Sequence, residues 1–496
     1  MTVEPVPAEN VWVGLDLGTQ SARAIAVTET GHVVGVGSRP LTSHRDGPRH
    51  EQDPDQWWQA IAAATAEVMR DVPAGTVRGV AVDATSGTIL LTDRLGRPVT
   101  PALMYDDTRA ADQVARVNDA GQAVWAELGY RRMQPAWALP KLLWLIQHYP
   151  GVVHDARLTH QNDVINRRLV GRDVPTDLSN ALKTGAHLIQ ETWPTDILDS
   201  LGVLAQLLPD LVRSGTPIGT VCAAATEATG IPEGTPVIAG ATDGCAAQLG
   251  AGPLTVGSWN SVLGTTLVLK GVTRELLRDS LGAVYSHKAP SGDWLPGGAS
   301  STGAGVISRD FAGRNLDELN QAASAREPAS AITYPLVSRG ERFPFVAPDA
   351  HGFVMGDPLD DADRFAAVLQ GVGFIERLCF DYLDLLGAPT SGDLILTGGA
   401  TKSEYWCQLR ADILGRSVTL PENAEPALGM AVLAASSGRN AADVAAEMVR
   451  VRDTIDPRPG SAGRFDDAYL TLVTELEHRG WLQPAAAVRA RERTNR

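Results

Sequence analysis

Two distant segments of the chain share one pattern, and this pattern limits most strongly the folds that the chain can adopt. In the first segment the apolar residues 11–15 lead into the turn 16–21, and residues 22–28 follow as a second apolar run. In the second segment, residues 258–263 and 267–270 flank the turn 264–266. Short apolar runs bounded by glycine and polar residues are typical of strands joined by tight turns. The sequence therefore predicts two similar halves, each with a strand, a turn that contains Gly and Thr, and a returning strand.

Helical segments lie between these strands. Asp53 can cap a helix that begins at Pro54, and residues 361–386 show a helical spacing of apolar side chains before Gly387. Strands that alternate with helices predict an α/β architecture. We place the first domain at residues 1–252, the second at 253–445 and a helical extension at 446–496, because Gly252-Pro253 is the clearest break in the pattern.

The composition is that of a globular protein. The 496 residues suffice for about two to four domains of roughly 150 residues each. With 58 acidic and 43 basic residues the net charge is −15, which argues against a nucleic-acid partner because phosphates are bound by clustered Lys and Arg. We expect the basic end of the chain to be a solvated, frayed terminus; its arginines are Arg489, Arg491, Arg493 and Arg496.

The cysteines and the apolar segments bear on the location of the protein in the cell. The four cysteines lack the close spacing of a zinc site or a redox dithiol, and we expect them to be reduced. No apolar run approaches the roughly 18 residues that span a bilayer, and residues 1–10 do not resemble a secretory signal peptide. These features predict a cytoplasmic protein.

The first turn carries a carboxylate, a glycine and a hydroxyl group close together, at Asp16, Gly18 and Thr19. Backbone N–H groups of such a turn can bind phosphate oxygens while the carboxylate holds a hydrated Mg²⁺ ion. The second turn, Gly264-Thr265-Thr266, is a similar candidate. Taken alone, either turn is also explained by an ordinary β-turn.

Two further candidates follow apolar strands. Gly398-Gly399-Ala400 would let a flat base lie against the backbone, because larger side chains would block the approach; a simple connection between strand and helix is the alternative. Asp243 follows the strand 236–239 among small residues, where restricted access of water would favour a role as proton acceptor. Its alternative role is to cap the next helix.

These candidates all lie at the carboxyl ends of predicted strands, where open α/β sheets bind ligands. Two phosphate-binding turns, a base-binding turn and a carboxylate predict phosphoryl transfer from a nucleotide. The chain contains neither the Gly-x-x-x-x-Gly-Lys-Ser/Thr motif of P-loop proteins nor the Asp-Phe-Gly motif of protein kinases.

The candidate residues resemble those of the FGGY carbohydrate kinases, which share the ATPase core of actin, hexokinase and Hsp70. The similarity runs from about residue 11 to residue 438. It implies an α/β protein with two ribonuclease H-like domains that flank a central cleft, with ATP and Mg²⁺ as cofactors. The motifs that carry it are Gly14-Leu15-Asp16-Leu17-Gly18-Thr19 with Arg23, Glu51-Gln52-Asp53-Pro54, Lys141-Leu142-Leu143-Trp144-Leu145, Gly240-Ala241-Thr242-Asp243, Gly264-Thr265-Thr266 and Gly398-Gly399-Ala400.

The same resemblance implies roles for single residues. Asp243 would be the general base that activates a sugar hydroxyl group. Asp16 and Thr19 would lie beside Mg²⁺ and the transferring phosphate, and Asp16 would hold the metal largely through water. Thr265 and Thr266 would lie near the nucleotide phosphates. The remaining nucleotide-binding residues would be Gly264, Gly398, Gly399, Ala400 and Ser403.

The sugar is predicted from the segment that follows residues 77–82. Typical D-xylulose kinases carry Gln-Met-His-Gly there, whereas this chain has Ala84-Thr85-Ser86-Gly87-Thr88. The chain resembles the D-ribulose kinase subgroup at this place and at residues 267–270, 284–288, 297–300 and 340–344. We therefore expect the product D-ribulose 5-phosphate, with Ser86 in contact with the sugar; D-xylulose is the alternative acceptor.

Other residues near this segment are weaker candidates. Asp107 and Arg109 are expected at the edge of the cleft as sugar contacts, and a surface ion pair explains them equally well. His287 and Lys288 are expected mainly to support the fold.

Two other classes of protein could use the same ATPase core, namely a nonenzymatic sugar sensor and a chaperone-like ATPase. Residues 1–10 leave no room for the DNA-binding helices of a sensor, and the segment after Asn440 is short for a peptide-binding domain. We therefore expect an enzyme with a small sugar substrate and without a nucleic-acid or membrane partner. The sequence does not decide whether the protein forms a homodimer.

Overall fold

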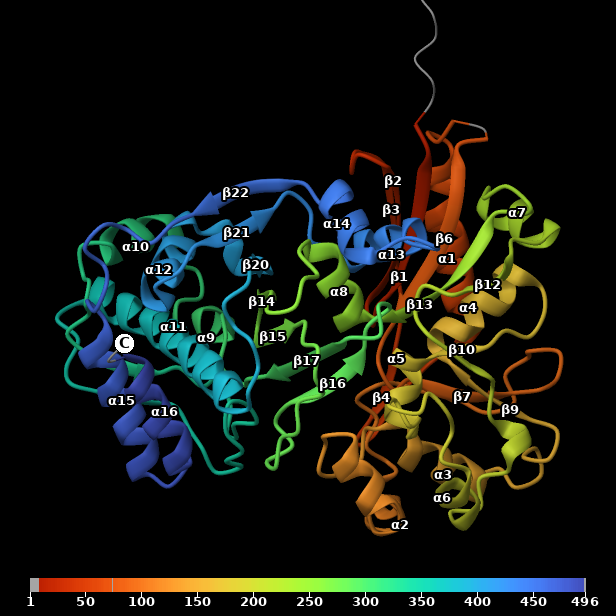
Figure 1. Cartoon of the computed structure of the whole chain (residues 1–496), viewed down its shortest axis with the longest axis horizontal. Helices are drawn as coiled ribbons and strands as arrows, with labels where there is room; N and C mark the ends of the chain where they lie inside the picture. The colour runs from red at the N-terminus through yellow and green to blue at the C-terminus, as the bar shows by residue number, and fades with distance from the viewer. Residues whose placement is uncertain (1–8, 74, 495–496) are drawn as a thin grey trace, which may run out of the picture. The chain divides into compact units, whose positions relative to one another are not determined.

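The computed structural model describes residues 9–73 and 75–494, which form two compact units. The first unit contains the chain up to Leu254 together with His287–Trp294 and Asn423–Arg450. The second unit contains Thr255–Ser286, Leu295–Glu422 and the chain from Val451 onward. Each unit has a mixed sheet with helices packed against it (Figure 1). Residues 1–8 of the predicted first domain, and Arg496 of the basic end, lie outside the described residues.

The main sheet of the first unit has its parallel strands in the middle. Strand β1 pairs with β2 in antiparallel fashion and with β6 in parallel fashion, and β6 pairs in parallel with β13. The carboxyl ends of β1, β6 and β13 therefore lie at the same edge of the sheet. In spatial order the strands are β12 (Pro217–Thr220), β13 (Pro236–Thr242), β6 (Val77–Ala84), β1 (Val11–Leu17), β2 (Ser21–Thr28) and β3 (Val33–Pro40).

Helices cover both faces of this sheet. Ala24 of β2 belongs to the core that contains Trp57 of helix α1 (Pro54–Met69). The next residue, Ile25, belongs to the core that contains Leu428 of helix α13 (Pro426–Ala435). Because successive side chains of a strand point to opposite faces, α1 and α13 lie on opposite sides of the sheet. Helix α8 (Asp243–Ala251) packs against α13.

A smaller sheet and several short helices complete the first unit. The strands of this sheet, in spatial order, are β4 (His44–Asp46), β5 (Arg49–Gln52), β8 (Ala102–Leu103), β7 (Ile89–Thr92) and β9 (Arg157–His160). The remaining elements are α2 (Val114–Glu127), α3 (Ala138–His148), α4 (Gln161–Val170), β10 (Thr176–Asp177), α5 (Leu178–Ala181), η2 (Leu182–Thr184), α6 (Thr195–Ser200), β11 (Leu211–Val212), α7 (Ala223–Thr229) and α14 (Ala441–Met448).

The sheet of the second unit repeats the pairing of the first. Strand β14 pairs with β15 in antiparallel fashion and with β20 in parallel fashion, as β1 does with β2 and β6. The predicted pair of similar α/β halves is therefore confirmed. The strands are, in spatial order, β16 (Tyr285–Lys288), β17 (Trp294–Ala299), β15 (Leu267–Gly271), β14 (Trp259–Leu263), β20 (Leu394–Thr397), β21 (Val418–Pro421) and β22 (Val451–Ile455).

The long helix α11 (Asp361–Leu385) lies in the main core of the second unit, where Phe374 contacts Tyr469 and Phe465. Strand β16 (Tyr285–Lys288) crosses the boundary between the units, because Ser286 belongs to the second and His287 to the first. The other elements of the second unit are α9 (Gly305–Asp310), α10 (Leu316–Ala323), β18 (Ile332–Tyr334), β19 (Phe353–Met355), η4 (Gly399–Lys402), α12 (Glu404–Leu414), α15 (Asp466–His478) and α16 (Pro484–Thr494).

The structure divides the chain differently from the predicted linear domains. Residues Asn423–Arg450 belong to the first unit, because helix α13 packs on β1 and β6. Residues from Val451 onward belong to the second unit and begin with strand β22, which pairs with β21. The end of the chain, predicted to be a helical extension, thus also contains a strand. The predicted single break near residue 252 does not separate the two units, because the chain passes between them several times.

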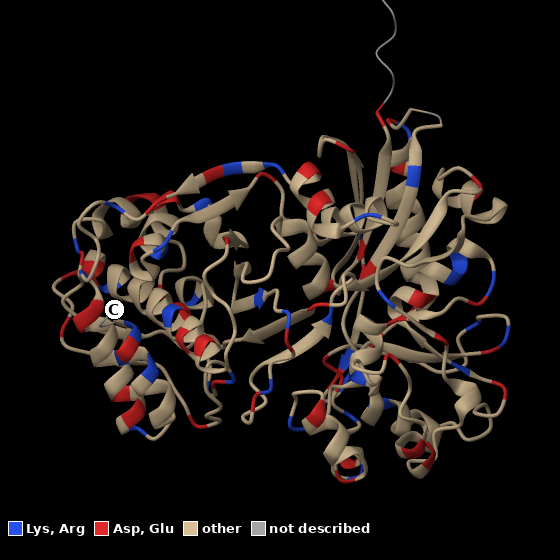
Figure 2. Cartoon of the chain, in the orientation of Figure 1, with Lys and Arg blue, Asp and Glu red and all other residues tan. Residues whose placement is uncertain are grey.

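The basic end of the chain is not frayed over the described residues, which corrects the prediction. Helix α16 buries Ala487 and Ala490 and contacts α11. Arg489 donates a hydrogen bond of 2.5 Å to Asp384, and Arg491 donates one of 2.5 Å to Glu477. Acidic and basic residues accordingly occur together on α15 and α16 (Figure 2). The apolar face of α16 consists of small alanines, which give only a weak helical pattern of hydrophobic residues in the sequence.

The predicted cap of helix α1 is confirmed. Asp53 caps α1 and accepts a hydrogen bond of 3.0 Å from the backbone N–H of Asp55. The four cysteines are free thiols. Among the described residues, no helix combines the length and the apolar character that crossing a membrane requires.

Close packing of α13 on β1 depends on a glycine. A Cβ atom added at Gly14 would lie 1.8 Å from the carbonyl oxygen of Ala427. We expect Gly14→Ala to lower the free energy of unfolding by about 1–3 kcal/mol, because the helix must move away from the sheet. Thermal unfolding of the two proteins measures the effect. Gly151→Ala is the control, since no atom lies within 4 Å of its added Cβ; equal melting temperatures of the two variants would contradict this interpretation.

Candidate active site

Asp243 is the first residue of helix α8 and directly follows strand β13. It is partly buried, and its carboxylate accepts a hydrogen bond of 2.7 Å from the backbone N–H of Gly244. This contact is not the predicted alternative cap, because the N-cap residue of α8 is Thr242 and no side-chain hydrogen bond caps the helix. It does not exclude a chemical role, because the Asp243 charge also acts on the pKa values of Asp16, Asp83 and Lys183.

Asp16 and Asp83 lie side by side on the parallel strands β1 and β6. Burial raises the pKa of both carboxyl groups, and the Asp243 charge raises both pKa values further; the Asp16 charge also raises the pKa of Asp83. Arg23 opposes this effect at Asp16, with Nη1 3.5 Å from Asp16 Oδ2. Asp83 is completely buried, and no hydrogen-bond donor among the described residues reaches its carboxyl oxygens. Burial therefore favours the protonated form of this pair, and most strongly that of Asp83, which is the more deeply buried.

Sequence reasoning missed Asp83, although a signal was present. Both β1 and β6 are apolar strands that end with an Asp followed by one more strand residue, in Asp16-Leu17 and Asp83-Ala84. Because parallel neighbours bring such positions together, the second Asp could have been found from the first.

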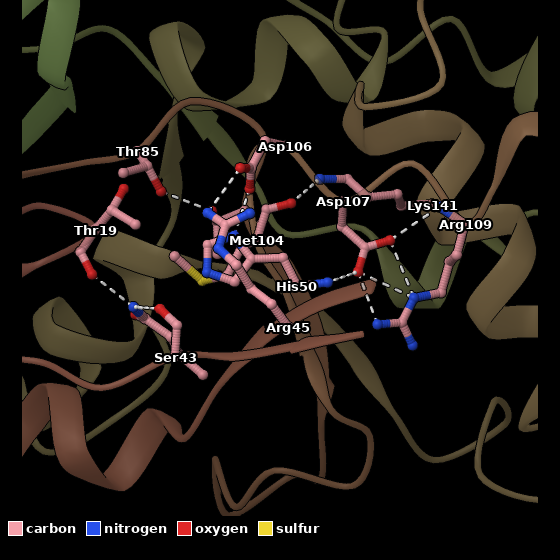
Figure 3. A network of polar contacts seen from close by, with 12 residues as sticks. Thr19, Ser43, Arg45, His50, Thr85, Met104, Asp106, Asp107, Arg109 and Lys141 are labelled. Atoms are coloured by element: carbon pink, nitrogen blue, oxygen red, sulfur yellow. Dashed lines mark hydrogen bonds and ion pairs between the residues drawn. The ribbon is translucent and has the colours of Figure 1, made fainter. Parts of the chain in front are cut away.

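Thr19 lies in the turn between β1 and β2, and a motif of the sequence fixes this turn. The Gln52 side chain donates hydrogen bonds to the carbonyl oxygen of Thr19 at 2.7 Å and to Ser43 Oγ at 2.8 Å (Figure 3). The indole N–H of Trp57 donates to Gln52 Oε1 at 2.7 Å and so orients the amide. Trp57 is fully buried in the core of the first unit, which fixes the indole that orients Gln52.

Ser86 follows strand β6, and its hydroxyl oxygen is buried without a hydrogen-bond partner among the described residues. The carbonyl oxygen of Ser86 accepts a hydrogen bond of 3.1 Å from Lys183 Nζ. Burial lowers the pKa of the Lys183 amine to about 8, while the Asp243 carboxylate opposes this shift. No motif indicated Lys183, which reaches Ser86 only through the tertiary fold.

Asp107 and Arg109 form an ion pair (Figure 3). Arg109 Nη2 lies 2.7 Å from Asp107 Oδ2, and Arg109 Nη1 lies 2.7 Å from Glu51 Oε1. The backbone N–H of His50 donates to Asp107 at 2.8 Å. The side chains of Asp107 and Arg109 are 0% and 5% exposed. The predicted alternative is therefore right about the ion pair and wrong about its place, because the pair is buried. Several hydrogen bonds compensate the burial of these charges. Their contact with a sugar stays a prediction.

The same network holds the segment around Tyr105 from two sides (Figure 3). Lys141 Nζ donates to the carbonyl oxygen of Met104 at 2.8 Å, and His50 Nδ1 lies 2.5 Å from Asp106 Oδ1. Tyr105 lies between these anchored residues and is 38% exposed. The Asp243 charge and a hydrogen bond with Thr19 both act on its pKa, so Tyr105 is a further residue of this site that sequence reasoning missed.

His287 and Lys288 contact protein groups, as expected. His287 is buried, and its Nδ1 lies 3.3 Å from the hydroxyl oxygen of Ser179. The Lys288 ammonium group lies 4.1 Å from the ring centre of Trp294. Ser179 also donates to or accepts from Thr242 at 3.0 Å, next to Asp243.

In the second unit, the turn Gly264–Thr266 joins β14 to β15 and is partly exposed. The carbonyl oxygen of Gly264 accepts a hydrogen bond of 2.8 Å from the backbone N–H of Ala304. The carbonyl oxygen of Thr265 accepts one of 3.1 Å from the N–H of Gly305. The turn therefore rests on the start of helix α9.

A cavity of about 260 Å³ adjoins the predicted base-binding segment of the second unit. Gly399, Ala400 and Ser403 line it, together with residues of α9, α10, α11 and α12. Gly398 has φ of +89°, and its added Cβ would lie 2.6 Å from the carbonyl oxygen of Leu263. The Ser403 hydroxyl group caps α12 by accepting a hydrogen bond of 3.1 Å from the N–H of Trp406. Ser403 therefore has a structural role, and its predicted contact with the nucleotide stays a prediction.

Two units with the same strand pairing define an ATPase fold of the actin and hexokinase type, which confirms the predicted ribonuclease H-like architecture of each unit. The model of the N-terminal domain of the FGGY family of carbohydrate kinases matches residues 11–250, and the C-terminal model matches residues 260–438. The chain therefore belongs to the FGGY family of carbohydrate kinases. It is an ATP-dependent sugar kinase, and this assignment favours an enzyme over the sensor and the chaperone-like ATPase.

Single relatives resemble the chain over nearly its full length. The xylulose kinase of Streptomyces coelicolor is 32% identical and covers 98% of this chain, which in turn covers 98% of the relative. The xylulose kinase of Escherichia coli is 30% identical over 86% of this chain and 89% of its own. The crystal structure of xylulose kinase from Rhodospirillum rubrum has a TM-score of 0.84 and 27% identity, and the match covers 94% of this chain and 99% of that one.

The pairing of Asp16 with Asp83 predicts how stability depends on pH. The raised pKa of Asp83 means that the folded protein keeps a proton that the unfolded chain releases above about pH 4. Stability is therefore lost as pH rises toward the folded pKa, by about 1.4 kcal/mol for each pKa unit of the shift. We expect Asp83→Asn, which cannot ionise, to melt at a higher temperature than the natural protein at pH 8, with the difference shrinking toward pH 5.

Thermal unfolding from pH 5 to pH 8 measures this difference. Asp71→Asn is the control, because Asp71 is exposed. A difference between Asp83→Asn and the natural protein that does not change with pH would contradict the buried proton.

Proposed function

We propose that this kinase transfers the γ-phosphoryl group of ATP to a pentulose, with Asp243 as the general base. The observation that carries the proposal is the set of groups around Asp243 in the first unit. Asp243 is partly exposed at the start of α8, whereas Asp16 and Asp83 are buried at the ends of neighbouring parallel strands. Of the three carboxylates, Asp243 is the one that a substrate can reach.

In the proposed reaction, the Asp243 carboxylate accepts the proton of a sugar hydroxyl group. The hydroxyl oxygen forms a bond to the γ-phosphorus, and the bond from that phosphorus to the bridging oxygen breaks, with its electron pair left on ADP. Lys183 supports this role. With a pKa of about 8 its amine is largely protonated at neutral pH, and a nearby positive charge favours the ionised form of Asp243.

The sugar side of the site would consist of groups that have unused hydrogen-bonding capacity or an exposed face. Ser86 offers a buried hydroxyl group without a partner in the described part of the chain. Lys183 and the exposed ring of Tyr105 lie near Asp243. Asp107 and Arg109, which pair with each other, would contact the sugar only at the margin of this set.

The nucleotide side would lie in the second unit. The turn Gly264–Thr266 would bind phosphate oxygens with Thr265 and Thr266, and the cavity next to Gly398, Gly399, Ala400 and Ser403 would hold adenosine.

The residues present also fit Mg²⁺. Among the described residues no group of three or more His, Cys, Asp or Glu side chains is arranged as a metal cage. Mg²⁺ instead commonly keeps several waters and uses one or two carboxylates with substrate phosphates. Asp16, whose neighbour Arg23 favours the ionised carboxylate, would hold it mainly through water. When bound, the ion would neutralise charge on the phosphates.

The identity of the pentulose rests on two observations that point in different directions. The names of the relatives favour D-xylulose. The segment Ala84-Thr85-Ser86-Gly87-Thr88, which resembles the D-ribulose kinase subgroup, favours D-ribulose. The comparisons therefore give no support to D-ribulose over D-xylulose, and both acceptors belong to the proposal.

A coupled assay of ADP release decides between them. We expect kcat/KM for one of the two pentuloses to exceed the values for L-ribulose, glycerol, ribitol and gluconate by about tenfold or more, since a site that hydrogen-bonds its substrate rejects analogues that leave its groups unpaired. Preference for glycerol or gluconate would overturn the proposed pentulose.

The role of Asp243 is tested by Asp243→Asn. We expect kcat to fall by about 10²–10⁴-fold, because proton transfer loses its acceptor, while ATP binding remains measurable by calorimetry. Asp443→Asn is the matched control, because Asp443 lies exposed in the first turn of another helix of the same unit, α14. An unchanged kcat for Asp243→Asn would remove the general base from the proposal.

A further inference from the structure

We propose that Glu341 is the positioning residue of the phosphate-binding turn Gly264–Thr266. The inference rests on the proposed nucleotide side of the second unit and adds a residue that touches neither nucleotide nor sugar. Glu341 belongs to the motif Gly340-Glu341-Arg342-Phe343-Pro344, which has no part in the site described so far.

The Glu341 carboxylate lies at the centre of a buried hydrogen-bond network. It is 3% exposed and accepts hydrogen bonds from five donors. Three donors belong to one turn of the chain: Ser300 Oγ at 3.0 Å, the backbone N–H of Ser301 at 2.7 Å and Thr302 Oγ1 at 3.4 Å. The other two are the Tyr334 hydroxyl group at 2.9 Å and the N–H of Arg342 at 3.0 Å. Glu341 thus fixes residues 300–302 to the strand β18 and to its own segment.

Residues 300–302 continue directly into the segment that supports the phosphate-binding turn. The N–H groups of Ala304 and Gly305 donate to the carbonyl oxygens of Gly264 and Thr265, at 2.8 and 3.1 Å. The contact is close, because a Cβ added at Gly303 would lie 2.4 Å from the carbonyl oxygen of Thr265. A shift of residues 300–302 therefore has to move the turn.

The geometry of the peptide bond links these contacts to phosphate binding. In a trans peptide the C=O of one residue and the N–H of the next point in opposite directions. The carbonyl groups of Gly264 and Thr265 point toward residues 304 and 305. The N–H groups of Thr265 and Thr266 therefore point away from this support, in a turn whose Thr265 is exposed. Such oriented N–H groups are the donors that bind phosphate oxygens.

The test compares two buried glutamates of the same unit. Glu341→Gln replaces an oxygen that only accepts hydrogen bonds with an NH₂ group that donates, and this group would face donors. Glu376→Gln is the matched control, because Glu376 is equally buried but pairs with Arg410 and Ser261 and not with residues 300–302. Calorimetry without sugar would measure binding of ATP and of adenosine to each folded variant.

We expect Glu341→Gln to raise the Kd for ATP by about tenfold or more, as loss of oriented N–H donors to a charged group does. The Kd for adenosine should stay unchanged, and Glu376→Gln should change neither value. An equal Kd for ATP in Glu341→Gln and the natural protein would overturn the inference. So would equal weakening of ATP and adenosine, because it would indicate a general loss of structure.

A milder variant covers the case in which Glu341→Gln does not fold. Ser300→Ala removes one of the five donors and should raise the Kd for ATP in the same direction by a smaller factor, without affecting adenosine; no change would overturn the inference. If the natural protein itself bound no ATP, the proposed nucleotide side would fail and not only the role of Glu341.

Discussion

The parallel pairing of β1, β6 and β13 is the constraint on which the rest of the first unit depends. Parallel neighbours end at the same edge of a sheet, so the pairing brings Asp16 and Asp83 together and places Asp243 just beyond the next strand. Three carboxylates so close repel one another. Burial and this repulsion raise the pKa of both buried carboxyl groups, whereas Arg23 lies beside Asp16 and Lys183 lies near Asp243.

Unequal burial gives these similar groups different chemical roles. Asp83 lies inside the sheet, where burial raises its pKa well above the usual value, whereas Asp243 begins a helix and remains partly exposed. A helix N-terminus favours a negative charge, which adds to the effect of Lys183. The proposed reaction thus assigns the base to the accessible Asp243 and leaves Asp83 as a buried partner. In the second unit, the network around Glu341 fixes the carbonyl groups of a turn and thereby directs its N–H groups.

Local residue order was enough to predict the repeated pattern of strand, turn and strand and the cap of Asp53 on α1, because these depend on neighbours in the chain. The place of α13 in the first unit, and the pairing of β22 with β21 in the second, could not be predicted in this way. Lys183 and Ser86 are far apart in sequence, and the paired Asp107 and Arg109, for which a surface ion pair was one of two predictions, are buried.

The sequence by itself determined which chemical groups stand at the ends of the strands, since the alternation of apolar runs with Asp, Gly and Thr is a property of short segments. It also indicated the family, because the order of several motifs along the chain is specific to the FGGY carbohydrate kinases. Only the tertiary structure decided which carboxylate is buried, which is open and which lysine stands beside it. Burial and charge proximity arise from contacts between residues that are remote along the chain, and these contacts exist only after the sheets have formed.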